Sequence, residues 1–138
     1  MTAIMLSIIV QVDDMKHIWK TRTFSRWMRK IQLKDPALIA AIEEMARGLV
    51  DADLGGNIYK KRIALPGRGK SGSTRTIIAT NRDDRWFFLY GFEKNERDNI
   101  TKDELDYLQD AAQVFLGYSD ADLESAIVIG ELLEVYHG

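Results

Sequence analysis

Three strand-like stretches between residues 58 and 92 constrain the fold of this chain more than any other feature. Residues 58–65, 73–80 and 85–92 are rich in β-branched and aromatic residues, a composition typical of β-strands. The polar segment 81–84 separates the last two stretches and has the composition of a hairpin turn. The pattern therefore predicts a meander of three antiparallel strands.

Helical patterns flank the predicted strands on both sides. Residues 24–31, and a segment that begins with Asp35 as its cap, carry apolar residues at three- and four-residue steps. On the C-terminal side, Thr101 and Glu104 have the spacing of a capping box, which predicts the start of a helix. Gly117 is the expected end of that helix.

The length of 138 residues indicates one domain, which we expect to span residues 15–118. Residues 1–14 are predicted to be a dispensable extension, with an extra edge strand as the alternative. Their apolar run is too short to span a bilayer and lacks the basic start of a signal peptide. Residues 119–138 are expected to be an acidic, helical extension that breaks at Gly130.

The chain contains no cysteine, and residues 60–100 contain no histidine. The absence of cysteine excludes disulfides, thiolate metal sites and a cysteine nucleophile, and it fits a reducing cytoplasm. Chemistry in the strand region must therefore depend on lysine, arginine, tyrosine, serine or carboxylates. No metal or organic cofactor is indicated.

Charge is distributed unevenly along the sequence. The net formal charge is +1 for residues 1–57, +5 for residues 58–100 and −8 for residues 101–138, which together give −2. A polyanion responds to the local field rather than to the total charge. The strand region is therefore the candidate surface for a negatively charged partner.

Basic residues occupy one face of the predicted strands. By two-residue alternation Lys60 shares a face with Arg62, and Arg75 shares a face of the second strand with Ile77. We expect aromatic residues to be buried on the opposite face, and Arg68 and Lys70 of the glycine-rich loop to converge with the three strand cations. Such a cluster favours a phosphate backbone, whereas the alternative is a set of solvated surface charges. The loop lacks the Walker spacing and leads into a strand, which argues against nucleotide hydrolysis.

The segment GFEKNERDNI, residues 91–100, joins the aromatic strand to the capped helix. Glu93, Lys94 and Arg97 are therefore held at a sheet edge between two rigid elements, where functional side chains are often placed. A structural role is the alternative, in which Asp98 satisfies turn amides and Arg97 pairs with a neighbouring glutamate in solvent.

The run PGRGKSGSTRTIIA, the aromatic strand WFFLYGF and the segment EKNERDNI together resemble the RelE/HigB-type toxins of bacterial toxin–antitoxin pairs. The resemblance covers residues 19–118. It implies an α+β fold, with a small antiparallel sheet, two N-terminal helices and a C-terminal helix. It also implies ribosome-dependent cleavage of messenger RNA, with translation inhibited as a result, and neutralisation by a cognate antitoxin of the helix-turn-helix type.

The same resemblance assigns roles to basic and aromatic residues of this sequence. It implies no metal, no cofactor, no small-molecule ligand and no membrane partner. The implied catalytic residues are Lys60, Arg62, Arg75 and Lys94, and the implied RNA-binding residues are Arg68, Lys70, Tyr90 and Arg97.

The expected reaction is attack of an RNA 2′-hydroxyl on the adjacent phosphorus. Arg75 and Arg62 are the best candidates for binding the phosphate, because a guanidinium stays charged and engages two oxygens. Lys60 or Lys94 is a candidate proton donor or acceptor, and Glu93 is an alternative base. The sequence leaves this choice open.

Two other functions are compatible with the same residues. ParE-like members of the wider superfamily inhibit gyrase, and for such a protein the sheet would be a docking surface without phosphate chemistry. The remaining alternative is an inactive relative that only binds its antitoxin.

Overall fold

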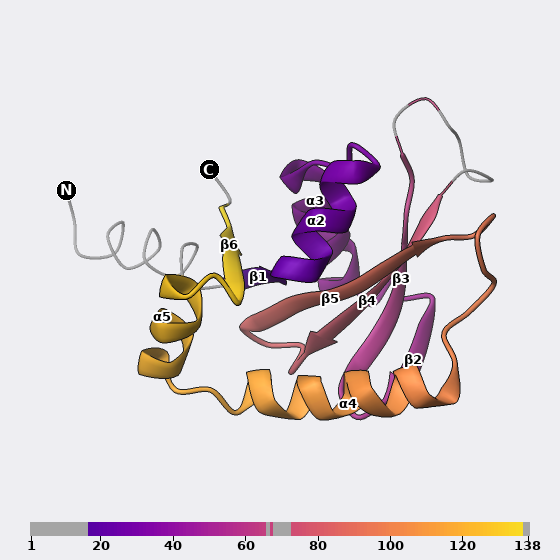
Figure 1. Ribbon diagram of the computed structural model, residues 1–138. Helices are drawn as coiled ribbons and strands as arrows, with labels where there is room; N and C mark the ends of the chain where they lie inside the picture. Colours follow the sequence, from indigo (N-terminus) through magenta and orange to yellow (C-terminus); the bar gives the residue numbers. More distant parts are fainter. Residues whose placement is uncertain (1–16, 66, 68–72, 137–138) are drawn as a thin grey trace, which may run out of the picture.

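The three predicted strands lie side by side in the middle of a six-stranded sheet (Figure 1). The computed structural model describes residues 17–65, 67 and 73–136. The strands are β1 (His17–Thr21), β2 (Ala52–Gly55), β3 (Ile58–Ile63), β4 (Thr74–Thr80), β5 (Arg85–Glu93) and β6 (Leu132–Val135).

The sheet has the order β2-β3-β4-β5-β1-β6 and is mostly antiparallel. The exception is β1, which runs parallel to β5 and antiparallel to β6. The predicted α+β fold with a small antiparallel sheet is thus confirmed, with one parallel pair added. Strand β2 was not predicted, since only the turn that follows it has a clear sequence signal.

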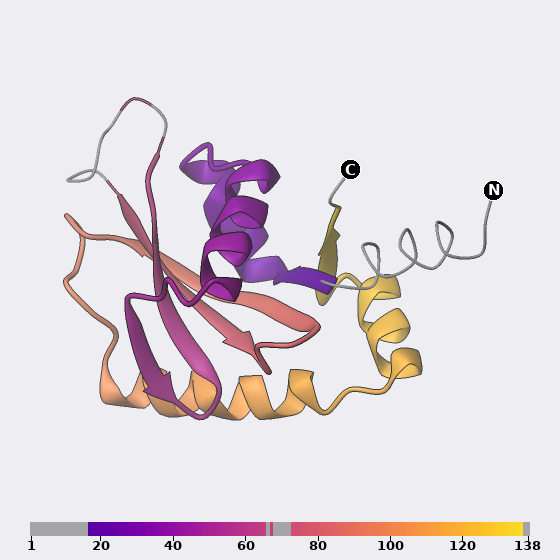
Figure 2. The ribbon, with the colours of Figure 1, turned by 180° about the vertical axis from the view of Figure 1, so that it is seen from behind.

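Helices cover both faces of the sheet (Figures 1 and 2). Two N-terminal helices pack on one face, as expected, and the long helix that follows β5 crosses the other face. The helices are α2 (Arg22–Lys30), α3 (Asp35–Ala46), α4 (Lys102–Leu116) and α5 (Asp120–Val128). Among the described residues, no helix is long and apolar enough to cross a membrane.

The helix caps confirm one prediction and correct another. In α4 the hydroxyl of Thr101 accepts from the Glu104 amide at 3.1 Å, and the Glu104 carboxylate accepts from the Thr101 amide at 2.8 Å. The predicted capping box is therefore present. Asp35 does not cap α3, whose N-cap is Lys34. The Asp35 carboxylate instead accepts a 2.8 Å hydrogen bond from the Lys20 ammonium, which joins α3 to β1.

Aromatic residues of β5 are buried on both sides of the sheet. Trp86 and Phe88 pack beneath α2 and α3, whereas Phe87 and Phe92 pack on the side of α4. The expectation that aromatic residues are buried on the face opposite the cations is wrong for Phe87 and Phe92, because α4 lies across part of the cation face and buries them there with Ile77. The basic residues therefore lie at the border of a core rather than on an open sheet.

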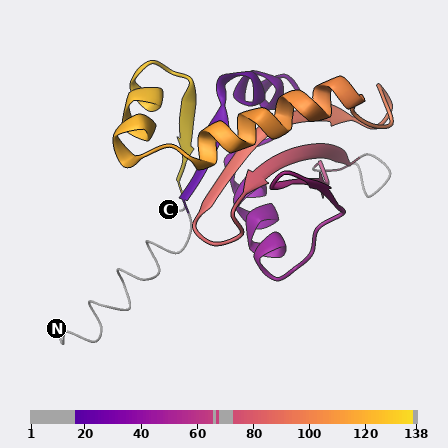
Figure 3. The ribbon, with the colours of Figure 1, turned by 90° about the horizontal axis from the view of Figure 1, so that it is seen from below.

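The chain beyond residue 118 is helix α5 followed by strand β6 (Figure 3). Leu132 and Val135 of β6 are buried beside β1, and Leu123 of α5 joins the core on the α4 side. The guanidinium of Arg22 donates to the carbonyls of Ile129 and Gly130 at 3.1 and 2.9 Å. These contacts attach the C-terminal segment to the junction of β1 and α2.

A chain that ends at residue 118 is expected to lose about 4 kcal/mol of unfolding free energy, because Leu123, Leu132 and Val135 no longer cover the core on the two faces of the sheet. Urea denaturation measures the loss. A chain shortened only by residues 137–138 is the control and should keep the wild-type midpoint. An unchanged midpoint for the longer truncation would contradict this account.

Candidate functional site

Arg62 and Arg75 lie directly opposite each other in the antiparallel pair of β3 and β4. Side chains at such positions are neighbours, about 5 Å apart at Cβ, and like charges placed there destabilise a sheet. Arg62 is exposed and Arg75 is half-buried. The guanidinium of Arg75 donates to the hydroxyl of Ser73 at 3.0 Å, which restrains it. Two cationic side chains are thus cross-strand neighbours, an arrangement that suits an anion.

The remaining predicted cations lie around this pair. Lys60 is half-buried two residues before Arg62 on the same face of β3, opposite Ile77. Lys94 is exposed in the turn that follows β5. Arg68 and Lys70 fall outside the described residues. The structure therefore brings together Lys60, Arg62 and Arg75 and places Lys94 at the end of the neighbouring strand.

A β-bulge brings Tyr90 onto the same side as these cations. Ile77 pairs with Tyr90 and Ile78 pairs with Phe88, so Leu89 is an extra residue in β5. Both Leu89 and Tyr90 consequently contact the core on the α4 side. Beyond the bulge, Phe92 lies opposite Arg75, and its ring centroid is 6.2 Å from that of Tyr90.

Arg97 is bound to the protein through most of its donors. Its Nη1 donates to the Glu104 carboxylate at 2.9 Å and to the Tyr90 hydroxyl at 3.3 Å, and its Nη2 bonds to the same carboxylate. Its Nε donates to the carbonyl of Asn99 at 3.0 Å, and its guanidinium carbon lies 5.7 Å from the Phe92 ring centroid. We call this pair of Arg97 and Glu104 the latch, because it joins the segment after β5 to the start of α4.

The latch changes the acidity of both partners. The hydrogen bond from Arg97, together with that from the Thr101 amide, lowers the pKa of Glu104 from 4.5 to about 2. The Glu104 carboxylate in turn raises the pKa of Arg97. The charge of Arg97 is thus balanced by that of Glu104, and its side chain holds the segment after β5 against α4. Its predicted role in RNA binding remains a prediction.

Stability should depend on pH through the latch. Since folding depresses the pKa of Glu104, its contribution is complete above pH 4.5, declines as the pH falls below that value and is lost at about pH 2. We expect the melting temperature of the wild type to fall more steeply over this range than that of Glu104→Gln. Equal slopes for the two proteins, measured by calorimetry, would show that the latch carries no such contribution.

Three residues of the site were not predicted from sequence. Ser73 restrains Arg75, Phe92 lies between Arg75 and Arg97, and Glu104 completes the latch. Glu104 had a visible signal only as a capping residue. The position of Phe92 depends on the bulge, for which the local sequence gave no sign.

The site has cations that suit a phosphate and one partly exposed aromatic ring, that of Tyr90, that suits a base, whereas Phe92 is buried. Among the described residues there is no group of three or more His, Asp or Glu side chains that could hold a metal ion.

Residues 16–135 match the family described as the RelE toxin of the RelE/RelB toxin–antitoxin system. A comparison with curated proteins finds no significant match.

Proposed function

The chain belongs to the RelE family of toxins, and we propose that it is a ribosome-dependent endoribonuclease that cuts messenger RNA and so inhibits translation. Family membership also implies a cognate RelB antitoxin. The observation that supports the nuclease function best is the pairing of Arg62 with Arg75 beside Tyr90 and Phe92. Two arginines suit a phosphate, and the partly exposed ring of Tyr90 suits an unpaired base.

In the proposed reaction the RNA 2′-oxygen forms a bond to the adjacent phosphorus and the bond to the 5′-oxygen breaks. The products are a 2′,3′-cyclic phosphate and a 5′-hydroxyl. Arg62 and Arg75 bind the phosphate oxygens and offset the charge that develops on them. One group accepts the 2′-hydroxyl proton and another donates a proton to the leaving oxygen, and the candidates are Lys60, Lys94 and Glu93.

In this proposal the ribosome positions the RNA for cleavage, which the site has few groups to do by itself. Phosphoryl transfer requires the attacking oxygen, the phosphorus and the leaving oxygen to lie in line, and correct positioning accounts for a large part of such catalysis. Helix α4 adds negative charge next to the latch through Asp103 in its first turn, which disfavours binding of free RNA. A message held on the ribosome is already positioned, and it does not have to bind against the negative charge of α4.

Purified protein added to a translation extract tests this proposal. We expect cleavage of a translated message and no cleavage of the same message without its start codon. Gyrase supercoiling is assayed in parallel with the same preparation. Inhibition of supercoiling without RNA cleavage would instead assign the protein to the gyrase inhibitors, and no effect in either assay would indicate an inactive relative.

A further inference from the structure

Glu104 makes a contact that its place in the helix cap does not require. Glu104 and Asp122 occupy the N3 position of the capping boxes of α4 and α5, and each carboxylate accepts a hydrogen bond from the amide of its cap residue. Within the described residues the Asp122 carboxylate has no other hydrogen-bond partner, whereas both oxygens of Glu104 also accept from Arg97. The contact with Arg97 is therefore additional to the cap.

Arg97 joins Glu104 to Tyr90. Its Nη1 donates to the Glu104 carboxylate at 2.9 Å and to the Tyr90 hydroxyl oxygen at 3.3 Å. A guanidinium has no acceptor, so the Tyr90 oxygen accepts this hydrogen bond and its own proton points elsewhere. In the part of the chain that the structure describes, Arg97 is the one hydrogen-bond partner of this hydroxyl. The Tyr90 proton is thus left for a further acceptor.

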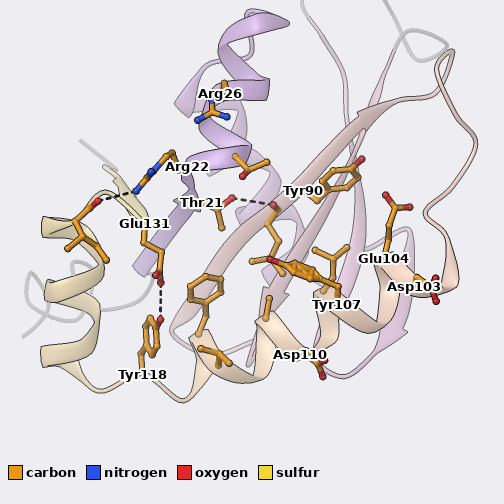
Figure 4. Close-up of a pocket in the computed structure, with 17 residues that line it drawn as sticks. Thr21, Arg22, Arg26, Tyr90, Asp103, Glu104, Tyr107, Asp110, Tyr118 and Glu131 are labelled. Carbon is orange, nitrogen blue, oxygen red and sulfur yellow. Dashed lines mark hydrogen bonds between the residues drawn. The ribbon is translucent and has the colours of Figure 1, made fainter.

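Tyr90 lies between the cation pair and an open groove. Tyr90 pairs with Ile77 and Phe92 pairs with Arg75, so Tyr90 and Arg75 are diagonal neighbours on one face of the sheet, about 7–8 Å apart. Tyr90 of β5 and Glu104 of α4 both line the groove between α2 and α4 (Figure 4). A nucleotide whose phosphate binds Arg75 can therefore place its base against the Tyr90 ring from the groove.

We propose that Glu104 is a positioning residue for RNA cleavage, acting through Arg97 on Tyr90. Glu104 holds the guanidinium of Arg97, and Arg97 fixes the Tyr90 side chain through its hydroxyl oxygen. Tyr90 then stacks on a base next to the cleaved bond and donates a hydrogen bond to the same nucleotide. Glu104 itself does not contact RNA. The inference rests on the proposed nuclease function, because Tyr90 has this ligand only if RNA is cut at the site.

A side chain that is ordered before binding loses less conformational freedom when its ligand arrives. Loss of the latch should therefore weaken RNA binding more than it slows the chemical step, since Arg62 and Arg75 stay in place. For Glu104→Ala we expect the KM for ribosomes that carry a defined message to rise about 5- to 10-fold. The kcat should change less than about 3-fold.

A matched control separates the latch from the helix cap. Asp122→Ala removes the corresponding carboxylate of the α5 capping box and should leave both kinetic constants unchanged. Glu104→Gln keeps an acceptor for the Thr101 amide, so it preserves the cap if Glu104→Ala fails to fold. Its weaker contact with Arg97 should raise the KM by an intermediate factor.

A double-mutant cycle tests whether Glu104 acts through the Tyr90 hydroxyl. Tyr90→Phe removes only that hydroxyl and should raise the KM to a similar extent as Glu104→Ala. Glu104→Ala should then add little in the Tyr90→Phe background. Effects that multiply in full would overturn the proposed route.

The remaining outcomes distinguish this inference from the nuclease function. No cleavage by the wild type would remove both together. Cleavage by the wild type with an unchanged KM in folded Glu104→Ala or Glu104→Gln would overturn the positioning role alone. A lower KM in these variants would show that Glu104 withholds Arg97 from RNA, which would also overturn it.

Discussion

Replacing Arg75 by alanine is expected to lower the rate of messenger-RNA cleavage on ribosomes by about 100- to 1,000-fold. Arg75 is held by Ser73 and lies opposite both Arg62 and Phe92, so its guanidinium is positioned before RNA binds. A group positioned in advance stabilises developing charge without reorganisation. Single-turnover cleavage on ribosomes that carry a defined message measures the rate.

Two variants control for this result. Arg75→Lys keeps the charge but loses the two-pronged contact with phosphate, and an intermediate rate is expected. Arg47→Ala removes an exposed arginine that follows α3, and it should cut at the wild-type rate. A wild-type rate for Arg75→Ala, in a protein with normal thermal stability, would remove Arg75 from the site.

Gly91→Ala is expected to lower the free energy of unfolding by about 3 kcal/mol. A Cβ added to Gly91 would lie 2.3 Å from the Cζ3 atom of Trp27, far inside van der Waals contact. Trp27 is part of α2, which packs on β5 at this point. The Trp27 ring, the helix or the strand must move to make room, and urea denaturation measures the cost.

A double-mutant cycle identifies the cause of that loss. Trp27→Ala removes the ring that the new methyl group would meet, so Gly91→Ala should cost much less in that background. The double variant is therefore expected to lose less unfolding free energy than the sum of the losses of the two single variants. An undiminished cost in the Trp27→Ala background would place the strain elsewhere, for example in the backbone of β5.

Features encoded in neighbouring residues could be predicted from the sequence. The capping box of Thr101 and Glu104 spans four residues, and the β4–β5 turn is specified by Asn81, whose side-chain carbonyl accepts from the amides of Asp83 and Asp84. Strand alternation correctly placed Arg75 on the same face as Ile77. The cross-strand meeting of Arg62 and Arg75 required the register, which alternation does not give.

Features that join distant residues could not be predicted. Strand β6 pairs with β1 across more than 100 residues, with Ile18 opposite Val135, and its four residues have no distinctive local pattern. The bulge at Leu89 changes which residues of β5 share a face, although WFFLY reads as plain alternation. The latch depends on a turn that brings Arg97 back to Glu104. Each is determined by tertiary packing rather than by local propensity.

The proposed nuclease function is tested most directly by mapping new messenger-RNA 5′ ends in bacteria after induction of the wild type and of Arg75→Ala. We expect the wild type to arrest growth and to produce cuts confined to translated regions, and the variant to lose both effects. Growth arrest without new 5′ ends, or cuts of equal frequency in untranslated RNA, would contradict ribosome-dependent cleavage by this site.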